Sequence, residues 1–179
     1  MDRIRQATVR DLDGVMALYA GARAFMRQNG NPSQWPEGYP ARESVEQALG
    51  DGSLYVLEDG GELAAVFTFA IGQEAPYDAI RGHWLTDTVP YGTLHRLAVG
   101  RQGGGLGAVC IEYAKARCHD LRIDTHEDNL PMQRLLARLG FVRCGIIDYG
   151  DEGTRIAYHW LNTKRAQGEC PTPRKEDCV

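Results

Sequence analysis

The spacing of apolar residues over the first fifty positions predicts one short strand and two helices. Residues 3–8 alternate between polar and apolar side chains, as a half-buried strand does. Residues 12–28 show helical spacing instead, with apolar positions at Leu12, Val15, Met16 and Tyr19. The Asn-Gly-Asn-Pro segment at 29–32 ends this helix, and a shorter helix is expected over residues 41–49.

The middle of the chain alternates with a period of two, which predicts strands. Residues 54–58 and 63–71 are separated by Asp59-Gly60-Gly61, a strong signal for a β-hairpin. Residues 73–92 show no such pattern, and connections of this length are often functional. A further strand over residues 93–99 leads directly into a glycine-rich segment.

The last part of the chain predicts two further helices among three strands. The helix after the glycines has an apolar face formed by Leu106, Val109, Cys110, Tyr113 and Ala114. A strand at 121–125 follows, and then a helix that Asn129 precedes and Gly140 ends. Strands at 141–147 and 154–161 complete the order βααβββαβαββ. This order is typical of a single α/β domain with a mixed sheet.

Composition agrees with one globular domain and narrows the function classes. Of the 179 residues, 43% are hydrophobic and 25% are charged, so wholesale disorder is excluded. We expect residues 1–162 to form the domain, and the polar residues 163–179 to form a disordered tail. The net charge of −4 gives no basic field for nucleic acid or an anionic membrane. No apolar run reaches the roughly 20 residues that cross a bilayer.

The cysteines and the N-terminus point to a cytoplasmic protein without a metal site. Five cysteines form no Cys-x-x-Cys pair and have irregular spacing, which favours reduced thiols over disulfides or zinc ligands. They are Cys110, Cys118, Cys144, Cys170 and Cys178. The first residues lack the apolar stretch of a secretory signal.

The glycine-rich segment predicts a binding site for a phosphate group. Strand, glycine turn and helix follow one another here, so the unpaired N–H groups of the helix start can approach an anion. A Walker A loop is excluded because no Lys-Ser or Lys-Thr pair follows. Gly103-x-Gly105-x-x-Ala108, with Asp124 beyond it, also fits a dinucleotide fingerprint. The preceding strand carries His95 and Arg96 rather than a buried apolar run, which argues against that reading.

The segment Gln102-Gly103-Gly104-Gly105-Leu106-Gly107 resembles the Q-x-x-G-x-G motif of the GCN5-related N-acetyltransferases, the GNAT family. The context is similar too, because Asn129 and then Leu139-Gly140-Phe141 follow at the family's spacing. The resemblance covers residues 3–161. It implies a GNAT-like, mostly antiparallel sheet and direct transfer of an acetyl group from acetyl-CoA to an amine.

The resemblance also implies which residues bind acetyl-CoA. The diphosphate would bind the backbone amides of Gln102, Gly103, Gly104, Gly105, Leu106 and Gly107. The pantetheine arm would pair with the strand edge at Leu97, Ala98 and Val99. Asn129 would reach the same arm or cap its helix, and Met132 would contact CoA or fill the core.

Acetylation of an amine requires a group that removes a proton, and His95 is our candidate for this base. Its position near the thioester is similar to that of a histidine in aralkylamine-type relatives, although a histidine packed on the sheet is an equal alternative. His126, or Glu127 acting through water, is a second choice. Many relatives carry a tyrosine acid where this chain has Leu136, so Tyr149 or solvent is the candidate to replace it, with a simple strand-end aromatic as the alternative for Tyr149.

The acceptor is expected to be a small-molecule amine bound by aromatic side chains from the first helices and the long connection. Trp35 and Trp84 are the main candidates, although both could instead pin loops to the core. Glu74 and Asp87 could hold a cationic amine. A non-catalytic domain that binds acyl-CoA stays open as an alternative, as do a protein acceptor and a homodimer.

Overall fold

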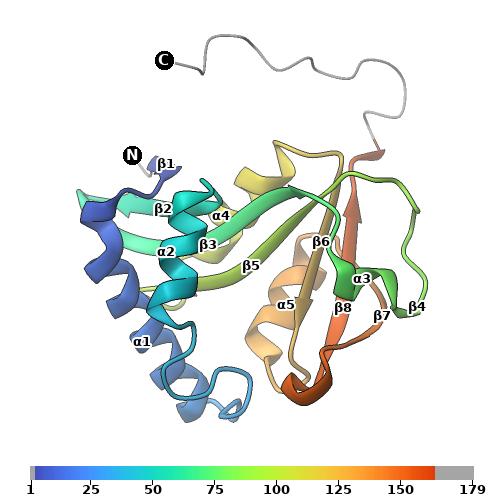
Figure 1. The fold of residues 1–179 in the computed structure, drawn as a ribbon, viewed down its shortest axis with the longest axis horizontal. Helices are drawn as coiled ribbons and strands as arrows, with labels where there is room; N and C mark the ends of the chain where they lie inside the picture. The colour runs from blue at the N-terminus through green and yellow to red at the C-terminus, as the bar shows by residue number, and fades with distance from the viewer. Residues whose placement is uncertain (1–2, 164–179) are drawn as a thin grey trace, which may run out of the picture.

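A computed structural model describes residues 3–163 as one sheet with helices on its faces (Figure 1). The eight strands lie in the order β1-β2-β3-β5-β6-β8-β7-β4. They are β1 (Arg3–Gln6), β2 (Leu54–Asp59), β3 (Glu62–Gly72), β4 (Arg81–Gly82), β5 (Tyr91–Val99), β6 (Asp120–Thr125), β7 (Val142–Asp148) and β8 (Thr154–Leu161). The helices are α1 (Leu12–Gln28), α2 (Arg42–Gly50), α3 (Ala75–Asp78), α4 (Leu106–Lys115) and α5 (Leu130–Arg138), with short 3-10 turns η1 (Val9–Asp11) and η2 (Gly150–Glu152).

The sheet is antiparallel except where β5 and β6 meet, which confirms the expected mixed α/β fold. Their parallel pairing joins Gly92 to Leu121 and Thr93 to Arg122, and it extends no further. Figure 1 shows the two strands diverging from this point. Beyond Thr93, the edge of β5 that faces β6 therefore borders a wedge-shaped space between the two strands instead of a paired strand.

Helices cover both faces of the sheet because β2 and β3 carry apolar residues on both sides. Val56 and Val66 pack in a core with α1 and α2. Their neighbours Leu57 and Phe67 point the opposite way and pack with α4. No helix within residues 3–163 is long and apolar enough to span a membrane. The predicted tail at 163–179 lies outside the described residues, apart from its first position.

The connection after β3, expected to be an open loop, contains the helix α3 and the strand β4. Strand β4 pairs with β7 at the sheet edge opposite β1, so the chain crosses the sheet and returns to β5. Gly82 and Gly145 allow this approach, because a Cβ on Gly82 would lie 2.2 Å from the carbonyl oxygen of Cys144. A strand of two residues has no periodicity, which is why the sequence pattern missed it.

A buried polar cluster attaches the returning part of this connection to the sheet. The Asp120 carboxylate accepts hydrogen bonds from Nε2 of His159 and, at 2.8 Å, from the hydroxyl of Thr86. Arg122 donates to the carbonyl oxygen of Thr86 at 3.0 Å and lies 3.4 Å from Asp120. All three charged or titratable side chains are nearly inaccessible to water.

We expect the Asp120→Ala variant to lose about 3–5 kcal/mol of unfolding free energy, because it leaves His159 and Arg122 buried without their carboxylate. Chemical denaturation of the purified variant measures this loss. Asp13→Ala is the control, since Asp13 pairs with Arg42 on the exposed surface, and its denaturation midpoint should barely change. Equal losses in the two variants would contradict a structural role for the buried cluster.

Candidate active site

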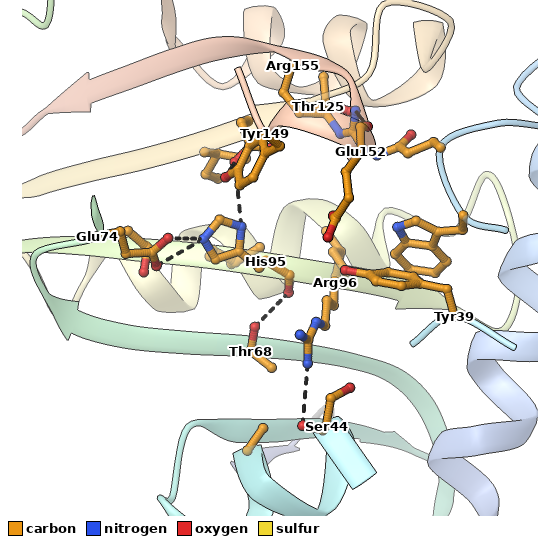
Figure 2. A pocket seen from close by; sticks show the side chains of 18 of the residues that line it. Tyr39, Ser44, Thr68, Glu74, His95, Arg96, Thr125, Tyr149, Glu152 and Arg155 are labelled. Carbon is orange, nitrogen blue, oxygen red and sulfur yellow. Dashed lines mark hydrogen bonds and ion pairs between the residues drawn. The ribbon is translucent and has the colours of Figure 1, made fainter. Parts of the chain in front are cut away.

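The divergence of β5 and β6 opens a pocket of about 810 Å³. Residues 94–97 of β5 and 123–125 of β6 form two of its walls. The segment after α1 and the turn η2 close it from the other sides, as the close view in Figure 2 shows in part. The pocket therefore lies along the edge of β5 that faces β6, where its main-chain groups have no neighbouring strand beyond Thr93.

A β-bulge in β5 directs two consecutive side chains into this pocket. Thr68 of β3 lies opposite His95 and Val66 opposite Ala98, so β5 has one extra residue between these pairs. Arg96 takes a φ of 53°, the one positive φ among non-glycine residues in the range 3–163. Neighbouring side chains of a regular strand point to opposite faces. The bulge removes this alternation, and both His95 and Arg96 line the pocket.

His95 lies between two carboxylates and is 28% exposed. Its Nε2 atom is 3.0 and 2.9 Å from the two carboxylate oxygens of Glu74, and its Nδ1 atom is 3.7 Å from Oδ2 of Asp124. Burial lowers the pKa of His95, but the hydrogen bond with Glu74 and the charge of Asp124 outweigh burial. The net effect raises the pKa of His95 above its ordinary value of 6.5.

Two tyrosines hold the second carboxylate in place. The phenol groups of Tyr77 and Tyr149 donate to the same Asp124 oxygen, at 2.8 and 2.9 Å (Figure 2 shows Tyr149). Burial and the charge of Asp124 together raise the pKa of both phenols above their ordinary value. Both tyrosines therefore keep their protons at neutral pH and act as hydrogen-bond donors to Asp124.

The glycine-rich turn joins the end of β5 to α4, which begins at Leu106 as expected. Gly103 and Gly105 have φ values of 78° and 73°, which side chains disfavour, and a Cβ on either would meet open space. No backbone N–H from residue 102 to 107 donates a hydrogen bond to another atom of residues 3–163. These amides and the start of α4 fit the diphosphate of a nucleotide such as CoA.

The other residues expected to contact CoA fall into two groups. Leu97, Asn129 and Met132 line the pocket, whereas the side chain of Ala98 is buried under α1 and Val99 is partly buried in the other core. Asn129 caps α5, because its side-chain oxygen accepts from the amide of Met132 at 3.2 Å.

Trp35 and Trp84, the expected acceptor contacts, lie in different surroundings. Trp35 lines the pocket and packs edge-on against Tyr19, with ring centroids 5.7 Å apart. Trp84 lies outside the pocket, since its indole N–H donates to the carbonyl of Tyr77 at 3.0 Å and its ring stacks with the guanidinium of Arg122. The structure thus brings one of the two tryptophans to the site.

The two second-choice bases, His126 and Glu127, lie outside the pocket, whereas two carboxylates not predicted as partners of His95 lie inside it. His126 accepts from the amide of Asp128 at 3.2 Å and is not among the pocket residues, and neither is Glu127. Glu74 was expected as an amine contact rather than as the partner of His95. The sequence carried no signal that Asp124 lies beside His95, because the pairing depends on how β6 leaves β5. Within residues 3–163 no group of three His, Cys, Asp or Glu side chains is placed to hold a metal ion.

Comparisons with known proteins agree with this geometry. Residues 18–141 match the model of the acetyltransferase (GNAT) family. The structure is similar to an acetyltransferase of the GNAT family from Streptococcus agalactiae, with 35% identity, a TM-score of 0.82 and coverage of 89% of this chain and 95% of that one. A putative acetyltransferase from Staphylococcus aureus is 25% identical with a TM-score of 0.65, over 88% and 97% of the two chains.

A more distant structure shares the fold and carries a ligand. It is described as the GphF GNAT-like decarboxylase in complex with isobutyryl-CoA, with 17% identity, a TM-score of 0.66 and coverage of 89% and 98%. The search of curated proteins gave no significant match. The family match spans more than half of the chain, and the Streptococcus agalactiae protein is similar over nearly all of it. This chain belongs to the GNAT acetyltransferase family.

Proposed function

We propose that this protein is an acetyl-CoA-dependent N-acetyltransferase that acetylates the amine of a small molecule. The observation that carries the proposal is His95, held between Glu74 and Asp124 in the pocket beside the unpaired edge of β5. Transfer to an amine needs a proton acceptor near neutral pH, and an imidazole is the side chain suited to this task. Bound acetyl-CoA would supply the acetyl group as an activated thioester.

The two carboxylates have different roles in the proposed proton transfer. An amine of pKa near 10 is only about one part in a thousand neutral at pH 7. Asp124 attracts the ammonium form, and Nδ1 of neutral His95 removes its proton. Glu74 accepts the hydrogen on Nε2, which fixes the tautomer and stabilises the imidazolium that forms.

The backbone holds the donor in this proposal. The unpaired amides of residues 102–107 bind the diphosphate, and the free edge of β5 at Leu97, Ala98 and Val99 pairs with the pantetheine arm. Met132 lies where it can contact the arm, while Asn129 is already engaged as a helix cap. The neighbour that carries isobutyryl-CoA supports an acyl-CoA site in this fold.

We assign Tyr149 a positioning role rather than that of the acid. Its phenol already donates to Asp124, and its pKa is raised, so it is a poor proton donor to a thiolate with a pKa near 8.5. The thiolate of CoA is a good leaving group without protonation. Tyr149 and Tyr77 instead keep Asp124 aimed at His95.

A screen of amines that follows the release of free CoA tests the proposed function. We expect acetyl-CoA to be consumed with at least one amine, and mass spectrometry of the product to show one added acetyl group. An alternative is a non-catalytic domain that binds acyl-CoA, or one that acts on the acyl group as the named decarboxylase does. Tight CoA binding without acetylation of any amine would favour that alternative and contradict our proposal.

The pH dependence of the reaction should follow His95. Because Glu74 and Asp124 raise its pKa above 6.5, kcat/KM should rise with pH and reach half its maximum above 6.5. In Glu74→Gln the imidazolium loses its anionic partner, so the midpoint should move to lower pH. The same acceptor is used throughout, so that the ionisation of the amine cancels in the comparison. Titration of the His95 ring by NMR checks the shift directly, and an unchanged midpoint in both measurements would contradict the pairing.

We also propose a cytoplasmic location. Cys110, Cys118 and Cys144 are free thiols, and burial raises the pKa of Cys110 and Cys118 to about 12. Such buried thiols pack as small apolar groups and are compatible with a reducing compartment.

A further inference from the structure

Arg96 lines the pocket and has no acidic partner among residues 3–163. Its one hydrogen bond within residues 3–163 goes to the carbonyl oxygen of Ser44 at the long distance of 3.4 Å. The guanidinium carbon lies 5.8 Å from the ring centre of Tyr39, and Figure 2 shows the side chain extending from β5 toward Ser44. A guanidinium has five N–H donors, so most of those on Arg96 remain available to a ligand.

Arg5 and Arg122 are also partly or fully buried, and each has a carboxylate partner. Arg5 pairs with Asp11 at 2.7 Å and with Glu58 at 2.6 Å, and Arg122 pairs with Asp120.

Arg23 and Arg155 are partly buried too, and their guanidinium groups donate to main-chain carbonyl oxygens at 2.6 and 2.9 Å. Arg96 has neither a carboxylate partner nor a hydrogen bond shorter than 3.4 Å within residues 3–163, and it adopts a backbone conformation that is strained for a residue other than glycine. A strained residue whose charge has no counter-ion, placed beside the proposed base, is typical of a binding site.

We infer that the acceptor is an amino-carboxylate, such as an amino acid, whose carboxylate binds Arg96 while its amine lies at His95. This inference rests on the proposed acetyltransferase function and names its substrate class. The planar guanidinium matches a carboxylate with two parallel hydrogen bonds. The β-bulge places the two recognising side chains at consecutive positions, so one small molecule can reach both.

The charges of the pocket favour a carboxylate over two other groups. A diamine would bring its second ammonium to Arg96 and be repelled. A phosphate carries up to two negative charges and would be repelled more strongly than a carboxylate by the acidic side chains that line the pocket. These are Asp51, Glu74, Asp124, Asp151 and Glu152.

Paired acceptors test the inference with the full-length enzyme. Each amino acid is compared with the amine that lacks its carboxylate, for example phenylalanine with phenethylamine and alanine with ethylamine, by the rate of CoA release. We expect kcat/KM to be about 10- to 100-fold higher for the amino acid of the preferred pair. This is the effect expected when a substrate gains hydrogen bonds to a charged group. Arg96→Gln should remove this preference, so that the amino acid and the plain amine of a pair are acetylated with similar kcat/KM. Arg96→Lys should restore part of it.

Arg155→Gln is the matched control. Arg155 also lines the pocket and carries the same charge, but its Nη1 atom already donates to the carbonyl oxygens of Glu152 and Thr154, both at 2.9 Å. This variant should keep the preference for the amino acid. Equal loss of preference in Arg96→Gln and Arg155→Gln would indicate a general charge effect and overturn the inference.

The remaining outcomes separate the inference from the proposed function. Preference for plain amines, putrescine or phosphoethanolamine would overturn the amino-carboxylate class while leaving acetyl transfer intact. If no acceptor releases CoA, the proposed function fails, and calorimetry with the same amino acids in the presence of CoA decides the role of Arg96. Binding that Arg96→Gln abolishes would support the carboxylate site, and the absence of binding would overturn it.

Discussion

The His95→Gln variant should acetylate its acceptor about 10²- to 10⁴-fold more slowly than the wild type, the range measured for loss of a general base. Glutamine retains a similar size and a polar end but cannot take a proton from the amine. The effect should appear in kcat, whereas the affinity for CoA measured by calorimetry should not change. Steady-state rates of CoA release and calorimetric titration provide the two measurements.

His119→Gln serves as the control for this variant. His119 is exposed on the turn before β6, does not line the pocket, and should keep full activity. If His95→Gln retained wild-type kcat across the pH range, His95 would be a packing residue and the proposed base would be wrong.

The Gly105→Val variant should bind CoA at least tenfold more weakly, equivalent to about 1.4 kcal/mol. Gly105 has a φ of 73° at the start of α4, and a Cβ there projects into open space where the diphosphate is proposed to lie. A β-branched residue both disfavours this φ and obstructs the backbone amides. Calorimetry with CoA measures the change.

Gly140→Val separates the loss of binding from a loss of stability. Gly140 has a φ of 78° after α5 and likewise has nothing within 4 Å of a Cβ, but it belongs to neither the pocket nor the turn. Its denaturation midpoint should fall as much as that of Gly105→Val, with no change in CoA affinity. Similar CoA affinities for the two variants would contradict diphosphate binding at the turn.

Most of the fold could be predicted from local patterns. The apolar spacing that predicted a helix over 12–28 produces α1, because this face packs in the core with β2 and β3. The Asp-Gly-Gly signal predicted the hairpin of β2 and β3, which the structure confirms. The pairing of β4 with β7 joins segments far apart in the chain, and a strand of two residues has no sequence pattern that predicts its partner.

In the candidate site, too, the residues that lie close together in the sequence were predictable, and those contributed by distant segments were not. The glycine turn and His95 lie within one contiguous stretch, so a strand and a turn signal were enough to select them. Glu74 lies 21 residues before His95, and Asp124 reaches it from β6. The bulge at Arg96 depends on the register between β3 and β5, a property of the pair of strands rather than of either one. For this reason the sequence was enough to select His95 as the proposed base, but not to identify Glu74 and Asp124 as its partners.

The bulge in β5 limits how acceptor choice can diverge in descendants of this protein. The positive φ at residue 96 is tolerated best by glycine, asparagine and aspartate, and poorly by β-branched residues. A single substitution there can thus abolish the cation or reverse its charge without disturbing the backbone, whereas valine or isoleucine would also strain the backbone of the bulge. New acceptor specificities should therefore arise at this position by changes of charge. Selectivity for apolar parts of the acceptor should instead evolve on the pocket wall formed by the segment after α1.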